Sequence, residues 1–260
     1  MKKTALITGA SSGIGLELAK LHARHQGDLV LVARSEETLL RLKEELESKH
    51  KINVMVIAKD LTKAEAASEI FEATQKAGIS VNYLINNAGF GGLGKFHERD
   101  WEMDKSMIQL NVMALTQLTR LYLPEMVRRN EGRILNVSST AALMPGPLQA
   151  VYYATKAFVT SFSNAINEEL SDTAVTVGTL MPGATETGFG SSSGMDKTPL
   201  FNKTSSAQEV AKAGYEGMLK GKLDIYAGVP FKFRIQFPFI SMVPKRMVLK
   251  SIKNLQKTND

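Results

Sequence analysis

Two residues four positions apart, Tyr152 and Lys156, are of the types that carry out proton transfer. A free phenol has a pKa of about 10 and is a poor base at neutral pH. Residues four apart share one face of a helix, so the Lys156 ammonium group would lie beside the phenol and favour the phenolate. Tyr152 could then act as a proton donor or acceptor. Taken singly, the tyrosine could equally be a packing aromatic and the lysine a solvated charge.

A glycine-rich segment near the N-terminus is the second pattern that indicates chemistry. Gly9, Gly13 and Gly15 lie between an apolar run and an amphipathic stretch, with the spacing G-x-x-x-G-x-G rather than G-x-G-x-x-G. In a dinucleotide-binding fold this turn needs glycine, because the backbone must approach the pyrophosphate closely. The motif is weak when alone. Its position between a strand and a helix favours dinucleotide binding over an ordinary turn.

Arg34 follows the second apolar run, where a dinucleotide-binding fold reads the adenosine ribose. An acidic residue at this place would accept the two ribose hydroxyl groups of NAD. A guanidinium group is instead suited to bidentate contact with a 2′-phosphate, which predicts NADP in preference to NAD. The alternative is an arginine at a helix entry that points to water. Ser12 is neutral, so the glycine-rich turn adds no second cation.

Short apolar runs alternate with longer amphipathic stretches along the whole chain, which predicts how these residues are positioned. This alternation indicates an α/β fold, a single-domain Rossmann-like doubly wound parallel sheet with helices on both faces. The expected strands are Thr4–Thr8, Leu29–Ala33, Asn53–Ala58, Asn82–Ile85, Arg133–Ser138, Ala174–Met181 and Leu223–Ala227. The expected helices include Glu36–Ser48, Lys63–Lys76, Trp101–Arg129 (bent or ended by Pro124), Val151–Leu170 and Ala207–Leu219.

In their order and spacing, the motifs of this chain resemble those of the short-chain dehydrogenase/reductase family. The resemblance covers residues 4–228 and implies a nicotinamide-dependent oxidoreductase that interconverts a carbonyl and an alcohol by hydride transfer. The motifs that carry it are Thr8-Gly9-x-x-x-Gly13-x-Gly15, Asn86-Asn87-Ala88-Gly89, Asn111, Ser139, Tyr152-x-x-x-Lys156 and Pro182-Gly183.

The resemblance implies a catalytic role for four residues. Tyr152 would be the acid or base, and Lys156 would also hold the nicotinamide ribose. Ser139 would hydrogen-bond the substrate oxygen, and Asn111 would hold a water in a proton relay behind the lysine. Ser139 and Tyr152 each have a neighbour of the same residue type, which could take the role instead.

Ser138 and Tyr153 are those alternatives. The separation of 13 between Ser139 and Tyr152 matches the family better than 14, and only Tyr152 has lysine four positions later.

The resemblance also implies a set of cofactor contacts. Asp60 would contact adenine, although it could instead cap the following helix. Asn87 would line the adenosine ribose, whereas Asn86 would steady the sheet. The segment Pro182–Thr187 would hold the nicotinamide amide, with Thr185 where an aliphatic residue is usual. The full set is Gly9, Ser11, Ser12, Gly13, Ile14, Gly15, Arg34, Asp60, Leu61, Asn87, Ala88, Gly89, Tyr152, Lys156, Pro182, Gly183, Thr185 and Thr187.

Composition excludes several other kinds of site. The chain has no cysteine, so disulfides, thiolate catalysis and cysteine-bound zinc are excluded. Its four histidines show no H-E-x-x-H spacing, so we expect no metal, and we interpret His22 and His25 as a solvated helix face. No apolar stretch is long enough to span a bilayer or to serve as an export signal, so we expect a cytoplasmic protein.

The net charge of +6 lies entirely in the C-terminal part. From Lys222 onward there are eight Lys or Arg and two acids, which leaves 32 − 8 = 24 basic and 26 − 2 = 24 acidic residues elsewhere. No basic stripe crosses the body of the chain, so we expect no nucleic-acid partner.

We divide the chain into residues 1–228, the dinucleotide-binding and catalytic domain, and residues 229–260, an apolar and basic C-terminal extension. The second part of the extension could form an amphipathic helix. We expect the extension, with Phe231, Phe233, Phe237 and Phe239, to pack on the same domain or on a partner subunit. Peripheral contact with an anionic membrane is the alternative. The resemblance implies a homodimer or homotetramer built on Trp101–Arg129 and Val151–Leu170.

The substrate is predicted to be an apolar carbonyl or alcohol. Three segments would select it: Phe90–His97, Ala141–Gln149 and Gly188–Ser206, the last a mobile cover over the substrate. The apolar residues that suggest such a pocket are Leu143, Met144, Pro145, Leu148 and Phe189. The competing hypothesis is a catalytically silent NADP-binding regulatory protein. Loss of a catalytic residue would have favoured it, and all are present.

Overall fold

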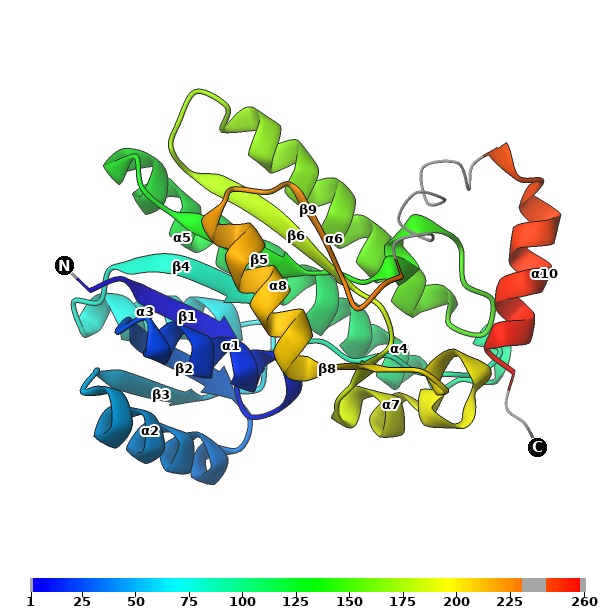
Figure 1. The fold of residues 1–260 in the computed structure, drawn as a ribbon, viewed down its shortest axis with the longest axis horizontal. Helices are drawn as coiled ribbons and strands as arrows, with labels where there is room; N and C mark the ends of the chain where they lie inside the picture. Colours follow the sequence, from blue (N-terminus) through cyan, green and yellow to red (C-terminus); the bar gives the residue numbers. More distant parts are fainter. Residues whose placement is uncertain (1, 231–241, 258–260) are drawn as a thin grey trace.

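A seven-stranded parallel sheet forms the centre of the computed structural model, which describes residues 2–230 and 242–257 (Figure 1). Every neighbouring pair of strands in this sheet is parallel. The strand order is β3-β2-β1-β4-β5-β6-β9. The strands are β1 (Thr4–Thr8), β2 (Asp28–Ala33), β3 (Val54–Ala58), β4 (Val81–Asn86), β5 (Arg133–Val137), β6 (Thr176–Pro182) and β9 (Asp224–Ala227).

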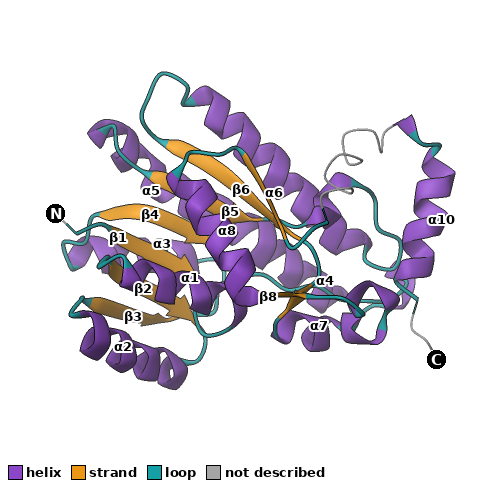
Figure 2. Cartoon of the chain, viewed as in Figure 1, coloured by secondary structure: helices purple, strands orange, loops and turns teal. Residues whose placement is uncertain are grey.

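Helices cover both faces of the sheet, so the chain forms three layers (Figure 2). Each face buries its own apolar cluster. One cluster includes residues of α1 (Gly13–Arg24), α2 (Glu36–His50) and α8 (Ala207–Leu219). The other includes residues of α3 (Ala66–Lys76) and α5 (Leu115–Arg129), with α6 (Ala150–Glu169) packed against it. The predicted doubly wound Rossmann-like sheet is therefore confirmed.

The strand order reverses at β1, and this reversal fixes where a ligand can bind. β1 pairs with β2 on one side and with β4 on the other, so the chain crosses over β1 after β3. The connections that leave β1 and β4 therefore run to opposite faces of the sheet. In open parallel sheets a crevice opens at this point, outside the carboxyl ends of the strands. The glycine-rich turn follows β1, and Asn87-Ala88-Gly89 follows β4.

The expected continuous helix Trp101–Arg129 has a different internal structure. It consists of α4 (Trp101–Ile108), a π-helical segment (Gln109–Ala114) and α5. Pro124 lies inside α5 and does not end it, which corrects that part of the prediction. The wider π-helical turn is centred on Asn111, a buried residue whose amide bonds other parts of the chain. Such π segments occur mostly within α-helices and frequently at functional sites.

The segment Gly188–Ser206 contains regular secondary structure, and its expected mobility stays a prediction. It contains α7 (Gly188–Ser193) and two 3-10 turns, Met195–Lys197 and Pro199–Phe201. A short parallel pair, β7 (Thr185–Glu186) with β8 (Ser205–Ser206), closes its two ends. The hydroxyl of Thr187 caps α7 by accepting from the Phe189 amide, and Gly194 ends it in the left-handed region. These caps bond backbone groups that would be unpaired at the two ends of the helix. The Gly- and Ser-rich composition of the segment does not by itself indicate a helix.

His22 is buried, contrary to the expected solvated helix face, whereas His25 is exposed. The His22 ring lies 2.8 Å from the Tyr215 hydroxyl through Nδ1 and 2.9 Å from the Lys3 carbonyl through Nε2. Burial lowers the pKa of His22, against the opposite effect of the backbone hydrogen bond with Lys3. The histidine therefore joins α1, α8 and the start of β1.

The C-terminal extension contains the expected amphipathic helix, α10 (Lys245–Leu255). Phe231, Phe233, Phe237 and Phe239 lie outside the described residues, so the expectation that they pack on protein stays a prediction. The division of the chain at residue 228 likewise stays a prediction. Within the described residues, no helix is long and apolar enough to cross a membrane.

Candidate active site

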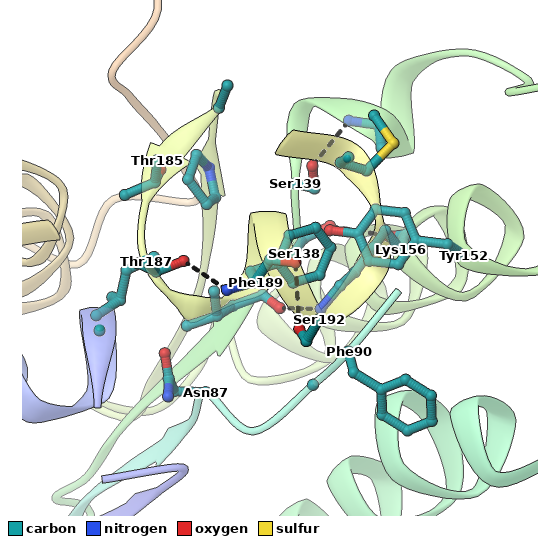
Figure 3. A pocket seen from close by; sticks show the side chains of 18 of the residues that line it. Asn87, Phe90, Ser138, Ser139, Tyr152, Lys156, Thr185, Thr187, Phe189 and Ser192 are labelled. Atoms are coloured by element: carbon teal, nitrogen blue, oxygen red, sulfur yellow. Dashed lines mark hydrogen bonds between the residues drawn. The ribbon is translucent and has the colours of Figure 1, made fainter. Parts of the chain in front are cut away.

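A cavity of about 2020 Å³ runs along the carboxyl ends of the strands and contains nearly all of the predicted site residues (Figure 3). Gly15 and Asn111 are the exceptions that do not line it. The predicted residues on its wall are Gly9, Ser11, Ser12, Gly13, Ile14, Arg34, Asp60, Leu61, Asn87, Ala88, Gly89, Ser139, Tyr152, Lys156, Pro182, Gly183, Thr185 and Thr187.

The glycine-rich turn is shaped for close approach of a ligand to its backbone. Gly9 and Gly13 have φ values of +67° and +55°, a region that favours glycine. A Cβ atom on Gly15 would lie 2.2 Å from the Gly9 carbonyl oxygen, so this glycine permits the turn to close although it does not line the cavity. Ser12 precedes α1 without capping it through its side chain, and the first turn of α1 has no acidic residue.

These features fit the pyrophosphate of a dinucleotide. A helix N-terminus presents backbone N–H groups and a partial positive charge, both of which favour an anion. The turn itself is fastened to β4. The Asn87 amide donates to the Thr8 carbonyl at 2.9 Å and to the Gly9 carbonyl at 3.2 Å. The Thr8 hydroxyl accepts from the backbone N–H groups of Asn87 and Ala88, each at 3.0 Å. Asn87 therefore supports the turn besides lining the cavity.

The end of the cavity at β2 and β3 carries charge. Arg34 is exposed on the wall, and Lys59 lines the same region, a cation that the sequence pattern did not single out. Asp60 accepts hydrogen bonds from the Thr62 amide at 3.0 Å and from the Thr62 hydroxyl at 2.9 Å. Burial opposes ionisation of Asp60, but these bonds and the nearby Arg34 charge outweigh it and lower the pKa of the carboxyl.

Asp60 does not cap the following helix, so that alternative is wrong. α3 begins at Ala66 rather than at the expected Lys63, and its N-cap residue is Glu65. The ionised carboxyl of Asp60 instead forms a turn with Thr62 on the cavity wall.

Tyr152, Lys156 and Ser139 meet at the opposite end of the cavity (Figure 3). Tyr152 and Lys156 lie one turn apart on α6, and Ser139 precedes the 3-10 turn Thr140–Leu143 that follows β5. The Ser139 hydroxyl accepts from the Ala141 amide at 3.1 Å and is near enough to the Tyr152 phenol to act on its pKa. The Lys156 ammonium donates to the Val137 carbonyl at 2.9 Å and lies 5.8 Å from the centroid of the Tyr152 ring. All three side chains therefore share one small volume.

The two neighbouring residues that were alternatives are engaged elsewhere. The Ser138 hydroxyl donates to the Lys156 carbonyl at 2.9 Å and lies 2.8 Å from the Thr160 hydroxyl, so it holds α6 against β5. The Tyr153 hydroxyl accepts from the Gln256 amide at 2.6 Å. This arrangement leaves the Ser139 and Tyr152 hydroxyl groups as the pair that face the cavity together.

Burial controls the protonation of this pair. It raises the pKa of Tyr152 to about 12, against the opposite effect of the Ser139 hydrogen bond. It lowers the pKa of Lys156 to about 8. Burial is the largest effect on the Tyr152 pKa, and the expectation that Lys156 favours the phenolate stays a prediction. At neutral pH the phenol keeps its proton and can donate it.

Asn111 lies behind the cavity wall and is fully engaged. Its amide oxygen accepts from the Phe90 N–H at 3.2 Å, and its NH₂ group donates to the Phe90 carbonyl at 3.0 Å and to the Thr155 hydroxyl at 3.1 Å. These bonds hold the backbone that follows Gly89 and the face of α6 in register. The side chain of Asn111 thus braces the site, and its role in holding a relay water stays a prediction.

The segment after β6 closes the cavity from a third side. The Thr185 hydroxyl donates to the Gly183 carbonyl at 2.9 Å, so it is turned to its own backbone. Thr187 lies against the glycine-rich turn, where its methyl carbon is 2.9 Å from the position of a Cβ atom on Gly13. Phe189 packs on Tyr152 with ring centroids 5.3 Å apart.

The remaining wall is mostly apolar. Met144 and Phe189 line it as predicted, whereas Leu143, Pro145 and Leu148 do not, which corrects that expectation. The sequence pattern missed two contributors to this wall. The first is α4 with the residues that follow it, which contribute Met103, Ser106 and Leu110. The second is the C-terminal part, which contributes Val243, Ser251, Ile252 and Leu255. The helical periodicity of Met247–Leu255 was visible in the sequence, but nothing local indicated which surface it would cover.

No group of three or more potential metal ligands occurs among the described residues.

Comparison with known proteins identifies the family. The model of the short chain dehydrogenase family matches residues 3–198. The chain is 30% identical over 266 residues to the human very-long-chain 3-oxoacyl-CoA reductase, and the match covers 98% of this chain and 80% of that protein. The match to the cattle protein of the same name covers 58% of its length.

Two solved structures share the whole fold. A short-chain dehydrogenase from Sphingobium yanoikuyae in complex with NADPH has a TM-score of 0.84 and 30% identity, covering 99% of each chain. The bulky-bulky ketone specific alcohol dehydrogenase from Comamonas testosteroni has a TM-score of 0.80 and 30% identity, covering 96% of this chain and 94% of that one. With the family match, they show that the chain belongs to the short-chain dehydrogenase/reductase family and is an oxidoreductase that acts with a nicotinamide cofactor on carbonyl or alcohol groups.

Proposed function

We propose that this protein is an NADP(H)-dependent oxidoreductase that interconverts an apolar carbonyl compound and its alcohol, with Tyr152 as the acid and base. The observation that carries the proposal is that the Tyr152 and Ser139 hydroxyl groups and the buried Lys156 lie together on the wall of an apolar cavity. A catalytically silent NADP-binding protein would not need to keep a phenol, a hydroxyl and an ammonium group together in this way.

In this mechanism, a bound nicotinamide cofactor supplies or accepts the hydride. The hydroxyl groups of Ser139 and Tyr152 converge on the carbonyl oxygen of the substrate and polarise it. As negative charge develops on that oxygen, the Tyr152 phenol transfers its proton to it. The Lys156 ammonium stabilises the phenolate that remains, since an opposite charge nearby favours the ionised form. In the direction of alcohol oxidation the same groups act in reverse.

The apolar wall supports a substrate with large apolar groups. Phe90, Met144 and Phe189 border the region beside Tyr152, and Met195 and Ile252 extend it. Relatives whose names include a very-long-chain 3-oxoacyl thioester and bulky ketones agree with such a substrate. Binding in a preformed apolar cavity would orient the carbonyl towards the two hydroxyl groups.

Arg34 and Lys59 support NADP as the form of the cofactor. Both line the cavity at the carboxyl ends of β2 and β3, and a guanidinium group can bond a phosphate with two parallel N–H donors. The similar Sphingobium yanoikuyae enzyme is described in complex with NADPH.

Replacing Tyr152 by Phe should lower the turnover of ketones by roughly 10²- to 10⁴-fold, since it removes the proton donor. NADPH oxidation with aliphatic ketones, aryl ketones and a 3-oxoacyl thioester measures turnover, and fluorescence titration measures NADPH affinity, which should fall far less than turnover. Tyr153→Phe is the matched control and should retain turnover. Wild-type protein that binds NADPH but reduces no carbonyl compound would favour the silent regulatory protein.

Carbonyl reduction should also fall as the pH rises through about 8, the pKa of Lys156. Below this pH the lysine is charged and can stabilise the phenolate; above it the charge is lost, whereas Tyr152, with a pKa of about 12, is still protonated. The measurement is kcat for ketone reduction at saturating substrate across this range. Lys156→Arg should be slower but free of this transition, because arginine keeps its charge. A wild-type rate that stays constant above pH 8 would contradict the role of Lys156.

Replacing Arg34 by Ala should raise the KM for NADPH by about 10- to 100-fold, as expected when a hydrogen-bonded charge contact is lost. The KM for NADH should change by less than about twofold, because NADH has no 2′-phosphate to bond. Arg24→Ala, an exposed arginine at the end of α1, is the matched control. Equal losses with both cofactors would show that Arg34 does not read the phosphate.

We also propose a homodimer or homotetramer built on α4, α5 and α6. Six large apolar side chains are exposed on these helices and the π-helical segment between them: Trp101, Met103, Ile108, Met113, Val127 and Phe158. Phe158 is stacked on Phe162, with ring centroids 5.6 Å apart. Exposed apolar side chains on adjacent helices favour burial against another copy.

In light scattering, the wild-type mass should be two or four times the 28.5 kDa of the chain, and Phe158→Glu should reduce it to that of a monomer. Leu40→Glu, which alters an exposed leucine on α2, should leave the wild-type mass unchanged. A monomeric wild-type protein would disprove the assembly without bearing on the reaction.

A further inference from the structure

The helix α10 is fixed in one orientation at the end of the molecule opposite α2 and β3 (Figure 1). Gln256, which follows the helix, is completely buried. Its amide donates to the Tyr153 hydroxyl at 2.6 Å, and its oxygen accepts from the Gln149 amide at 3.3 Å. Ile252 packs on the apolar cluster that contains Tyr152 and Tyr153. The inner face of α10 therefore forms part of the wall of the cavity.

The outer face of α10 carries only positive charge. Arg246, Lys250 and Lys253 are exposed, as are Lys245 and Lys257 at its two ends. Residues 242–257 contain no aspartate or glutamate. Within the part of the chain that the structure describes, none of the five cations forms an ion pair. Their charge is therefore available to an anionic surface.

Exposed apolar side chains border the mouth of the cavity beside this basic face. Four of them line the cavity and are still 37–51% exposed: Met103, Leu200, Val243 and Leu255. Met242 and Met247, next to them in the chain, are 79% and 64% exposed. Contiguous exposed apolar groups beside charged ones mark a binding surface. An apolar rim would not bind a water-soluble substrate, so these residues are suited to an apolar partner.

We propose that α10 and this apolar rim dock on the surface of an anionic lipid bilayer. The cations would contact the lipid head groups, and Met242, Val243 and Met247 would enter the boundary of the acyl chains. The occupant must offer negative charge to the cations, an apolar layer to the rim, and apolar molecules to the cavity. A bilayer of anionic lipids supplies all three, whereas an acidic protein would match the charge alone. If the proposed apolar substrate is correct, it would pass from the bilayer directly into the cavity.

Co-sedimentation of the full chain with vesicles tests the proposal. One set of vesicles is phosphatidylcholine alone, and the other is equal parts of phosphatidylcholine and phosphatidylglycerol. The wild-type protein should bind the anionic vesicles, bind the neutral ones far more weakly, and dissociate as salt is added. The variant K250Q/K253Q should bind the anionic vesicles roughly 25-fold more weakly, since each cation near such a surface contributes about fivefold. M242S/M247S should also bind more weakly at every salt concentration.

The control K49Q/K76Q makes the same change in net charge on α2 and α3, and it should bind like the wild type. Absence of wild-type binding to anionic vesicles, or equal binding by K250Q/K253Q, would overturn the proposal. A change in oligomeric mass without a change in vesicle binding would assign the surface to a second copy of the chain and would also overturn it. Turnover of a water-soluble ketone without vesicles is measured on each variant, so failure of the proposed reaction is seen separately.

Discussion

The burial of a lysine ammonium group beside a phenol is the interaction on which the rest of the site depends. A cation removed from water is costly unless its donors find acceptors. Lys156 meets this requirement through the Val137 carbonyl at the end of β5. The arrangement holds only while α6 keeps its position against that strand, which Ser138 secures by bonding the Lys156 carbonyl and approaching Thr160. The two adjacent serines therefore have different roles: Ser138 holds α6 in place, and Ser139 lies beside the Tyr152 phenol at the cavity.

Buried polar bonds extend this constraint into the sheet. Asn136 on β5 accepts from the Asn86 amide of β4 at 2.9 Å and donates to the Ser163 hydroxyl of α6 at 2.8 Å. Thr8 and Asn87 in turn join β1 to the segment after β4. Such networks have directional bonds, so they specify one register where apolar contacts alone would tolerate sliding. The distance from the glycine-rich turn to Tyr152 is thus set by strands that are bonded side by side.

The sequence was sufficient where the information is local. Continuous apolar runs predicted the strands, glycine marked the turn that needs φ values above zero, and the pair Tyr152 and Lys156 was found from helical spacing. The prediction failed where distant residues decide the outcome. The π-helical turn at Asn111 depends on partners at Phe90 and Thr155. The pKa of Tyr152 depends on burial, which spacing along a helix does not reveal.

The bond between Gln256 and Tyr153 has a consequence for the order in which the molecule is made. The strands and turns that form the dinucleotide half, β1 to β4, lie in the first third of the chain, whereas the last wall of the cavity comes from residues 243–256. Because synthesis proceeds from the N-terminus, every residue predicted to contact the cofactor is made before α10. A nascent chain would therefore contain the whole set of nucleotide contacts while the helix that encloses the substrate side was still to be added.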